Sequence, residues 1–147
     1  MAVKNGVSLN WGGFDKALGK AAHKLGDTQA LMESVGDALV SGTLKRFDAE
    51  EDPTGKKWKP SARASAEGGK TLTDTALLRR SIDYAATPDK VMVGSNLKYA
   101  RIHQKGGKTG KGHKVNMPAR PYLGVSKDDM EEVKETLADF LKGAFKP

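Results

Sequence analysis

Apolar side chains recur with the period of an α-helix in two long segments of the chain. In residues 27–47 they repeat at steps of about three and four positions. The members of this face are Leu31, Met32, Val35, Leu39, Thr43, Leu44 and Phe47. In and next to residues 127–142 the corresponding face consists of Met130, Val133, Leu137, Phe140, Leu141 and Ala144. Each segment therefore predicts an amphipathic helix with one face in the core.

The residues that precede these helices fit helix N-termini. Asp27 or Thr28 can cap the first helix, and Ser126 can cap the second, where acidic residues in the first turns complement the helix dipole. A shorter helical pattern over residues 14–25 is closed by a glycine. Residues 1–26 are therefore predicted to form an N-terminal helical extension.

Apolar and polar positions alternate on either side of a turn in residues 82–94. The alternating apolar positions are Ile82, Tyr84, Ala86, Val91 and Val93. Between them, Pro88 followed by Asp89 fits a type I turn. The segment therefore predicts a β-hairpin. Residues 74–82 suit a short helix with Leu77 and Leu78 directed inward, and residues 115–125 suit a further strand and a corner at two prolines.

Two segments lack a repeating apolar pattern. Residues 53–70 are rich in Pro, Gly, Ser, Ala and Lys, with Trp58 as their large apolar side chain. Residues 105–114 contain four glycines and four lysines, besides one threonine and one histidine. We expect flexible loops at 53–70 and 104–114, the first of them anchored by Trp58.

These elements together predict an α+β fold in which a small antiparallel sheet packs against two longer helices. The length of 147 residues and the apolar content of 37% suit a single domain over residues 1–147. The chain has no cysteine, which excludes disulfides, thiolate metal ligands and a thiol nucleophile. No run of signal-peptide or membrane-spanning character is present, so we expect a cytoplasmic protein with no membrane partner.

The positive charge of the chain is concentrated in one region. The formal net charge is +7, and residues 98–120 carry seven Lys and Arg without an Asp or Glu. An acidic partner such as a nucleic acid or an acidic protein face is therefore expected. The lysines of the glycine-rich segment are Lys105, Lys108, Lys111 and Lys114. They either belong to a solvated hairpin connection or reach a phosphate or acidic neighbour.

The residue types associated with catalysis are present without the spacing that catalysis needs. Two Gly-Lys-Thr triplets lack the earlier glycine of a phosphate-binding loop. His103 can titrate near neutral pH, but the nearest acidic residues in sequence are Asp89 and Asp128. We therefore predict that His103 is a structural or interface residue and that the protein is not an enzyme and uses no cofactor or metal.

Arg120 lies between two prolines that should hold it in a fixed direction. Pro118 and Pro121 bracket Ala119 and Arg120 and exclude a regular helix or a central strand there. The planar guanidinium suits a salt bridge, a carbonyl cap or a contact with another subunit or with DNA. The residues alone leave these alternatives open.

Several stretches in fixed order resemble the phage virion morphogenesis, or tail completion, family of Mu-like and related tailed phages. The stretches are PTGKKWKP, LTDTALLRRSI, VMVGSNLKYARIHQKGG and MPARPYLGVS, followed by the acidic C-terminal helix. In this chain the positions that match the family's motifs are Trp58, Tyr99, His103, Gln104, Pro118, Pro121, Tyr122 and Gly124. Two residues depart from the usual pattern: Ala76 stands where glycine is common, and Lys105 where an aromatic residue is common.

The resemblance implies a non-enzymatic structural protein of the virion neck or tail end, assembled in the host cytoplasm. Such a protein completes the tail and lets it join the head. Its implied partners are other tail, neck and head-connector proteins, further copies of itself in a ring such as a hexamer, and packaged DNA through nonspecific contact. The alternative is a free-standing basic protein that binds nucleic acid by itself.

Overall fold

The computed structural model describes residues 28–144, so the predicted extension over residues 1–26 lies outside the described residues. Both long helices are confirmed as α2 (Gln29–Ala49) and α6 (Lys127–Ala144). Thr28 occupies the N-cap position of α2, but its hydroxyl donates to the carbonyl oxygen of Pro88 instead of capping the helix. The start of α2 is thereby tied to the turn of the predicted β-hairpin.

The predicted hairpin is confirmed as strands β1 (Asp83–Thr87) and β2 (Lys90–Gly94). The strands are antiparallel, with Tyr84 opposite Val93 and Ala86 opposite Val91. Val91 and Val93 are buried on the face that packs against α2. The predicted α+β fold class is confirmed, and the β1–β2 hairpin is one of two small antiparallel sheets among the described residues.

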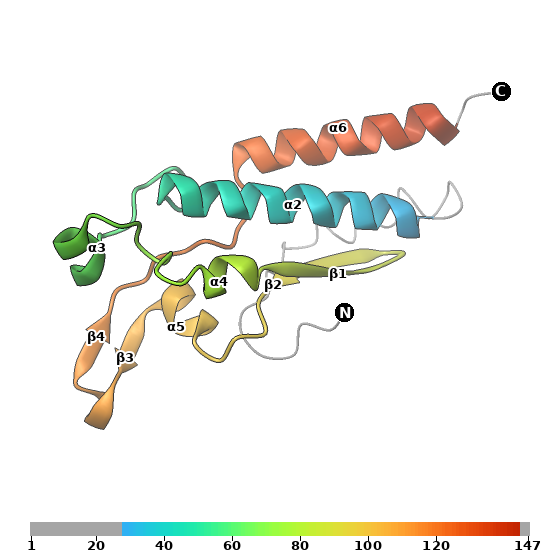
Figure 1. Cartoon of the computed structure of the whole chain (residues 1–147). Helices are drawn as coiled ribbons and strands as arrows, with labels where there is room; N and C mark the ends of the chain where they lie inside the picture. Colours follow the sequence, from blue (N-terminus) through green and yellow to red (C-terminus); the bar gives the residue numbers. More distant parts are fainter. Residues whose placement is uncertain (1–27, 145–147) are drawn as a thin grey trace.

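The three largest parts of the domain form successive layers. Figure 1 shows α6, α2 and the β1–β2 hairpin in that order, with α2 between the other two. Both helices were predicted to pack on the sheet, whereas α6 packs on the opposite side of α2 from the hairpin (Figure 1). The middle position explains why α2 has an apolar surface wider than a single stripe.

Two glycines of α2 allow the close packing of these layers. A Cβ at Gly36 would lie 2.4 Å from Cδ2 of Tyr84 in β1, and a Cβ at Gly42 would lie 1.8 Å from Oδ1 of Asp129 in α6. Each glycine weakens a helix interior by about 1 kcal/mol relative to alanine. Both glycines therefore permit a close contact, Gly36 toward the sheet and Gly42 toward α6.

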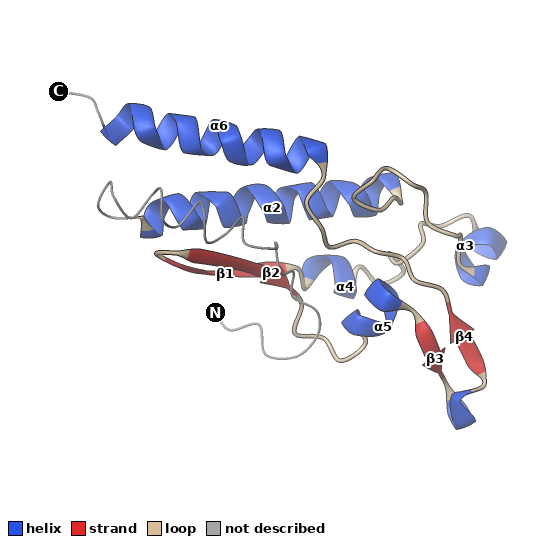
Figure 2. Ribbon diagram, turned by 180° about the vertical axis from the view of Figure 1, so that it is seen from behind, coloured by secondary structure: helices blue, strands red, loops and turns tan. Residues whose placement is uncertain are grey.

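The second half of the domain consists of shorter elements around the corner at residues 117–124. They are α3 (Ala62–Glu67), α4 (Leu77–Arg80), α5 (Ala100–Lys105), β3 (Gly107–Thr109), a 3-10 turn η1 (Lys111–His113) and β4 (Val115–Met117). Strands β3 and β4 pair with each other in a separate two-stranded sheet. Figure 2 shows this second hairpin projecting beyond α5, on the side of α2 away from α6.

Three local expectations need correction. Residues 53–70 are not an irregular loop throughout, because Ser61 caps α3 by accepting a hydrogen bond from the backbone N–H of Ala64. Residues 104–114 are not a loop either, because they include the end of α5, strand β3 and η1. Backbone pairing between β3 and β4 orders this segment even though its side chains have no core of their own.

The third correction concerns the short helix expected at 74–82. Ala76 has φ 62° and ψ 12°, a left-handed conformation that cannot be part of a right-handed helix, so α4 begins only at Leu77. Leu78 is buried, but Leu77 is 53% exposed instead of facing inward. A helix of four residues buries one narrow face, so two consecutive leucines cannot both point into the core.

Candidate assembly surface

The side chain of Gln104 holds the corner from one side. Its Oε1 accepts hydrogen bonds from the backbone N–H groups of Tyr122 and Leu123, both at 3.0 Å, and its Nε2 donates to the carbonyl oxygen of Leu123 at 3.2 Å. The amide therefore pairs with the extended backbone much as a neighbouring strand would. This pairing gives a structural role to the glutamine that follows His103 in the stretch VMVGSNLKYARIHQKGG.

Aromatic side chains hold the corner from the core. Tyr122 is fully buried, its hydroxyl donates to the carbonyl oxygen of Ala100 at 2.8 Å, and burial raises the pKa of the phenol. Trp58 donates its indole N–H to the carbonyl oxygen of Pro121 at 2.8 Å. Phe47 of α2 lies against both rings, with centroid distances of 5.6 Å to Trp58 and 5.2 Å to Tyr122.

Arg120 is part of this framework. Its side chain is almost fully buried, and its Nε donates to the carbonyl oxygen of Lys59 at 2.7 Å, while Nη1 lies 3.6 Å from the sulfur of Met117. Burial lowers the pKa of the guanidinium. Of the alternatives left open by the sequence, this geometry favours the carbonyl cap. Its burial leaves little of the side chain for a direct contact with a partner or with DNA.

His103 lies beside Arg120 without a catalytic partner among the described residues. Its backbone oxygen accepts from the N–H of Arg120 at 2.8 Å, and its ring meets that of Tyr99 edge-on, with centroids 5.9 Å apart. Burial and the nearby Arg120 charge lower the pKa of the imidazole. Within residues 28–144, Nδ1 is buried without a hydrogen-bond partner, and no group of His, Asp and Glu suited to a metal ion occurs.

Backbone conformation and close packing explain two glycines in the family-like stretches, Gly106 and Gly124. Gly106 has φ 68° and ψ −176°, and a Cβ there would lie 2.6 Å from the backbone nitrogen of Ala119. This backbone conformation is essentially restricted to glycine. At Gly124 a Cβ would lie 2.3 Å from Cγ of Pro53. The corner thus packs directly against the start of the second hairpin and against the turn after α2.

Arg46, which was not predicted from the sequence, has the largest set of polar contacts at the corner. Its guanidinium donates to Oδ2 of Asp129 at 2.6 Å, to the carbonyl oxygen of Tyr122 at 2.8 Å and to that of Gly124 at 3.0 Å. Both partners of the ion pair are buried. The sequence does contain an indication of this role, because Arg46 follows Leu39 and Thr43 at helical spacing and so lies on the apolar face of the helix. A charged residue on such a face requires a buried partner.

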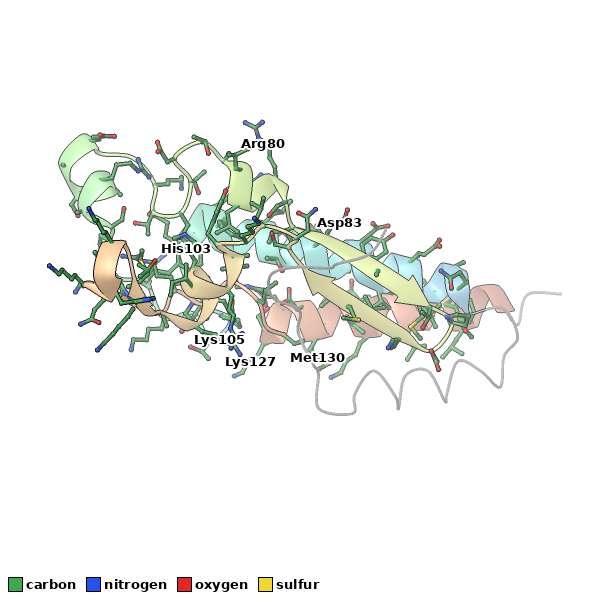
Figure 3. The ribbon with its side chains drawn as sticks, turned by 90° about the horizontal axis from the view of Figure 1, so that it is seen from below. Arg80, Asp83, His103, Lys105, Lys127 and Met130 are labelled. Carbon is green, nitrogen blue, oxygen red and sulfur yellow. The ribbon has the colours of Figure 1, made fainter. Side chains whose placement is uncertain are left out.

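The lysines singled out in the sequence lie on the exposed side of this framework. Lys105 ends α5, Lys108 lies in β3, and Lys111 and Lys114 lie at the end of the hairpin; all four are exposed. In Figure 3, Lys105 lies at the edge of the molecule and His103 lies inside its outline. The basic hairpin, residues 107–117, therefore presents positive charge on a projecting element.

A surface of opposite charge lies between α2 and α6. It is a groove of about 900 Å³ that runs from the C-terminal half of α2 to the first turns of α6 and the turn at residues 51–55. Besides the buried Arg46 and Asp129 pair, its charged lining residues are Glu51, Asp52, Asp128, Glu131 and Glu132, against Lys45 and Lys127. We call this surface the acidic groove.

These features are typical of a protein that assembles with other macromolecules, and comparison with known proteins gives the class. The model of the phage virion morphogenesis family matches residues 9–142. The chain belongs to this family, and the resemblance seen in its motifs is confirmed. Its role is therefore in the structure or assembly of a phage virion.

Two relatives cover most of the chain. The Mu-like prophage FluMu G protein 2 of Haemophilus influenzae is 33% identical over 126 residues, with 86% of this chain and 87% of the relative aligned. The putative capsid assembly protein G of Escherichia phage Mu is 31% identical over 128 residues, with 80% and 82% aligned. No solved structure gives a significant match. Among residues 28–144, no helix is long and apolar enough to cross a membrane.

Proposed function

We propose that the protein is a non-enzymatic component of the virion neck or tail end, where it completes the tail and enables the tail to join the head. The observation that carries this proposal is the arrangement of the family-like motif residues. Gln104, Tyr122 and Trp58 build one hydrogen-bonded framework and are not gathered around a reactive centre. Such a framework supports surfaces for binding, and it supplies no nucleophile or general base.

The basic hairpin is the proposed contact surface for this role. Its lysines are exposed, while Arg120 and Gln104 fix the corner that follows it. The partners we propose are other tail, neck and head-connector proteins and further copies of the chain in a ring. Packaged duplex DNA is a further partner through nonspecific phosphate contact.

Deletion of the gene from its phage tests the tail role directly. We expect lysates with DNA-filled heads and separate or irregular tails, and infectious particles on supplying the intact gene from a plasmid. Electron microscopy distinguishes the outcomes. Absence of normal heads would contradict a tail-end role and favour capsid assembly, the role for which the phage Mu relative is named.

A free-standing nucleic-acid-binding protein is the second candidate, because the exposed lysines of the basic hairpin suit phosphates. The two candidates differ in where the protein is found. A virion component sediments with purified particles in a fixed ratio to the tail proteins. A free-standing protein stays in the soluble fraction and binds duplex DNA as a monomer or dimer with a steep salt dependence.

A further inference from the structure

The domain carries two exposed surfaces of opposite charge. The basic hairpin has Lys108, Lys111 and Lys114 and no acidic residue. The acidic groove has, apart from its buried ion pair, five acidic and two basic side chains in its lining. The groove also has apolar lining from Ala38, Ala49, Pro53 and Val125. Each surface has the chemistry that the other one needs.

The two surfaces of one molecule face different directions. The acidic groove lies between α2 and α6, whereas the basic hairpin projects from the opposite side of α2 (Figures 1 and 2). The base of the hairpin is held in place by Gly106, which packs against the backbone of residues 117–119. The hairpin therefore cannot turn back to fill the groove of its own chain.

We propose that the basic hairpin of one copy binds in the acidic groove of a second copy. Lysines at the end of the hairpin meet the carboxylates of Glu131 and Glu132, which are both exposed. Val115 of β4, which is 51% exposed, supplies an apolar contact for the aliphatic lining of the groove. A nucleic acid would match the hairpin alone, because the acidic groove repels phosphates.

The contact joins different surfaces on the two copies, so each copy keeps one free hairpin and one free groove. Contacts of this type build a closed ring if the rotation between neighbours closes, and an open filament if it does not. The inference rests on the charges and positions of the two surfaces. It holds whether or not the protein acts at the tail end.

Charge reversal on each surface, alone and in a mixture, tests the proposal. The hairpin variant Lys111→Glu with Lys114→Glu and the groove variant Glu131→Lys with Glu132→Lys change the net charge by equal and opposite amounts. Each variant places like charges opposite one another at the contact, so each should weaken self-association by about a hundredfold. Sedimentation velocity at low salt measures the association.

The decisive sample is an equimolar mixture of the two variants. The acidic hairpin of one variant matches the basic groove of the other, and the remaining pair of surfaces is native, so alternating complexes should form. Lys90→Glu with Lys134→Glu is the matched control for the hairpin variant, since both lysines are exposed and lie outside both surfaces, and the net charge changes by the same amount. The control should associate like the parent protein, and all variants should keep the parent circular dichroism spectrum.

Three results would overturn the proposal. The first is a parent protein that stays monomeric at low salt and high concentration. The second is unchanged self-association in either charge-reversal variant. The third is a mixture that stays dissociated while both variants are folded. If the hairpin variant loses only its binding to duplex DNA, the basic hairpin is a nucleic-acid contact instead.

Discussion

Single residues explain why the corner has its conformation, and some of them are visible in the sequence. The paired prolines at 118 and 121 indicate a corner, and Gln104 stands out in the sequence as a motif position of the family resemblance. The hydrogen bonds from Gln104 to residues 122 and 123 could not be predicted, because they depend on where α5 lies relative to the corner. Spacing along a chain gives no information on such distant contacts.

Ala76 has a left-handed backbone conformation, and this predicts a stabilising substitution. A side chain raises the energy of this conformation by roughly 1–2 kcal/mol, while glycine loses about 0.5–1 kcal/mol more chain entropy on folding. Ala76→Gly should therefore raise the free energy of unfolding by about 0.5–1 kcal/mol. Denaturant unfolding checks this expectation. Ala66→Gly is the control, because Ala66 is exposed inside α3 and glycine should destabilise the helix there.

The buried imidazole of His103 predicts a pH dependence of stability. Burial and Arg120 lower its pKa below the ordinary value of 6.5, so the unfolded chain binds a proton more readily than the folded one. Stability should therefore fall as the pH drops from 6.5 through the pKa of the folded state. In His103→Gln this part of the pH dependence should be absent. Thermal melts of both proteins between neutral and mildly acidic pH test it, and parallel curves would show that His103 does not contribute.

Some elements of the domain have a strong repeating pattern of apolar residues, whereas others form only because neighbouring segments pair with them. Helices α2 and α6 and the β1–β2 hairpin follow periods that burial imposes, so the sequence predicts them. Strands β3 and β4 have exposed side chains, and their pairing is a property of the backbone. The position of α6 on the far side of α2 also had no signal in the spacing of apolar residues.

The contact between α2 and α6 depends on the buried pair of Arg46 and Asp129. Arg46→Met should lower the free energy of unfolding by about 3–5 kcal/mol, because it leaves a buried carboxylate without its counter-charge. Adding Asp129→Asn removes that charge but keeps an oxygen that can accept from the N–H of Ser126. The double variant should therefore lose less than the sum of the single variants, by about 1–3 kcal/mol. Additive losses in denaturant unfolding would show that the two groups act independently.

The domain as a whole separates its stable core from its proposed contact surfaces. The core lies where α2 meets the β1–β2 hairpin, α6 and the corner, whereas the lysines of the basic hairpin contact solvent. Family membership could be predicted from the ordered motifs, which the sequence contains with departures at Ala76 and Lys105. The acidic groove could not be predicted, because its two walls are about 80 residues apart in the chain, as the contact of Arg46 with Asp129 shows.

Removal of the four predicted contact lysines should separate function from stability. The variant with Lys105, Lys108, Lys111 and Lys114 changed to serine should melt within a few degrees of the parent, since exposed substitutions shift stability by about 0.5 kcal/mol or less. It should join heads to tails less efficiently in an extract assay. Serine at Lys90, Lys98, Lys134 and Lys142, which are also exposed, gives the matched control. Equal joining by the two variants would mean that the four predicted contact lysines have no special role.

The attachment of the corner also determines how the molecule bears mechanical load. Tension applied at the end of the basic hairpin passes along β4 into residues 118–124. This stretch is fastened side by side to α2 through Arg46, to α5 through Gln104 and to the segment after α2 through Trp58. Hydrogen bonds that are loaded in parallel share the applied force, so they must break together. If the proposed contact between copies forms, an assembled particle under stress should fail first at that contact, and each subunit should separate with its basic hairpin still folded.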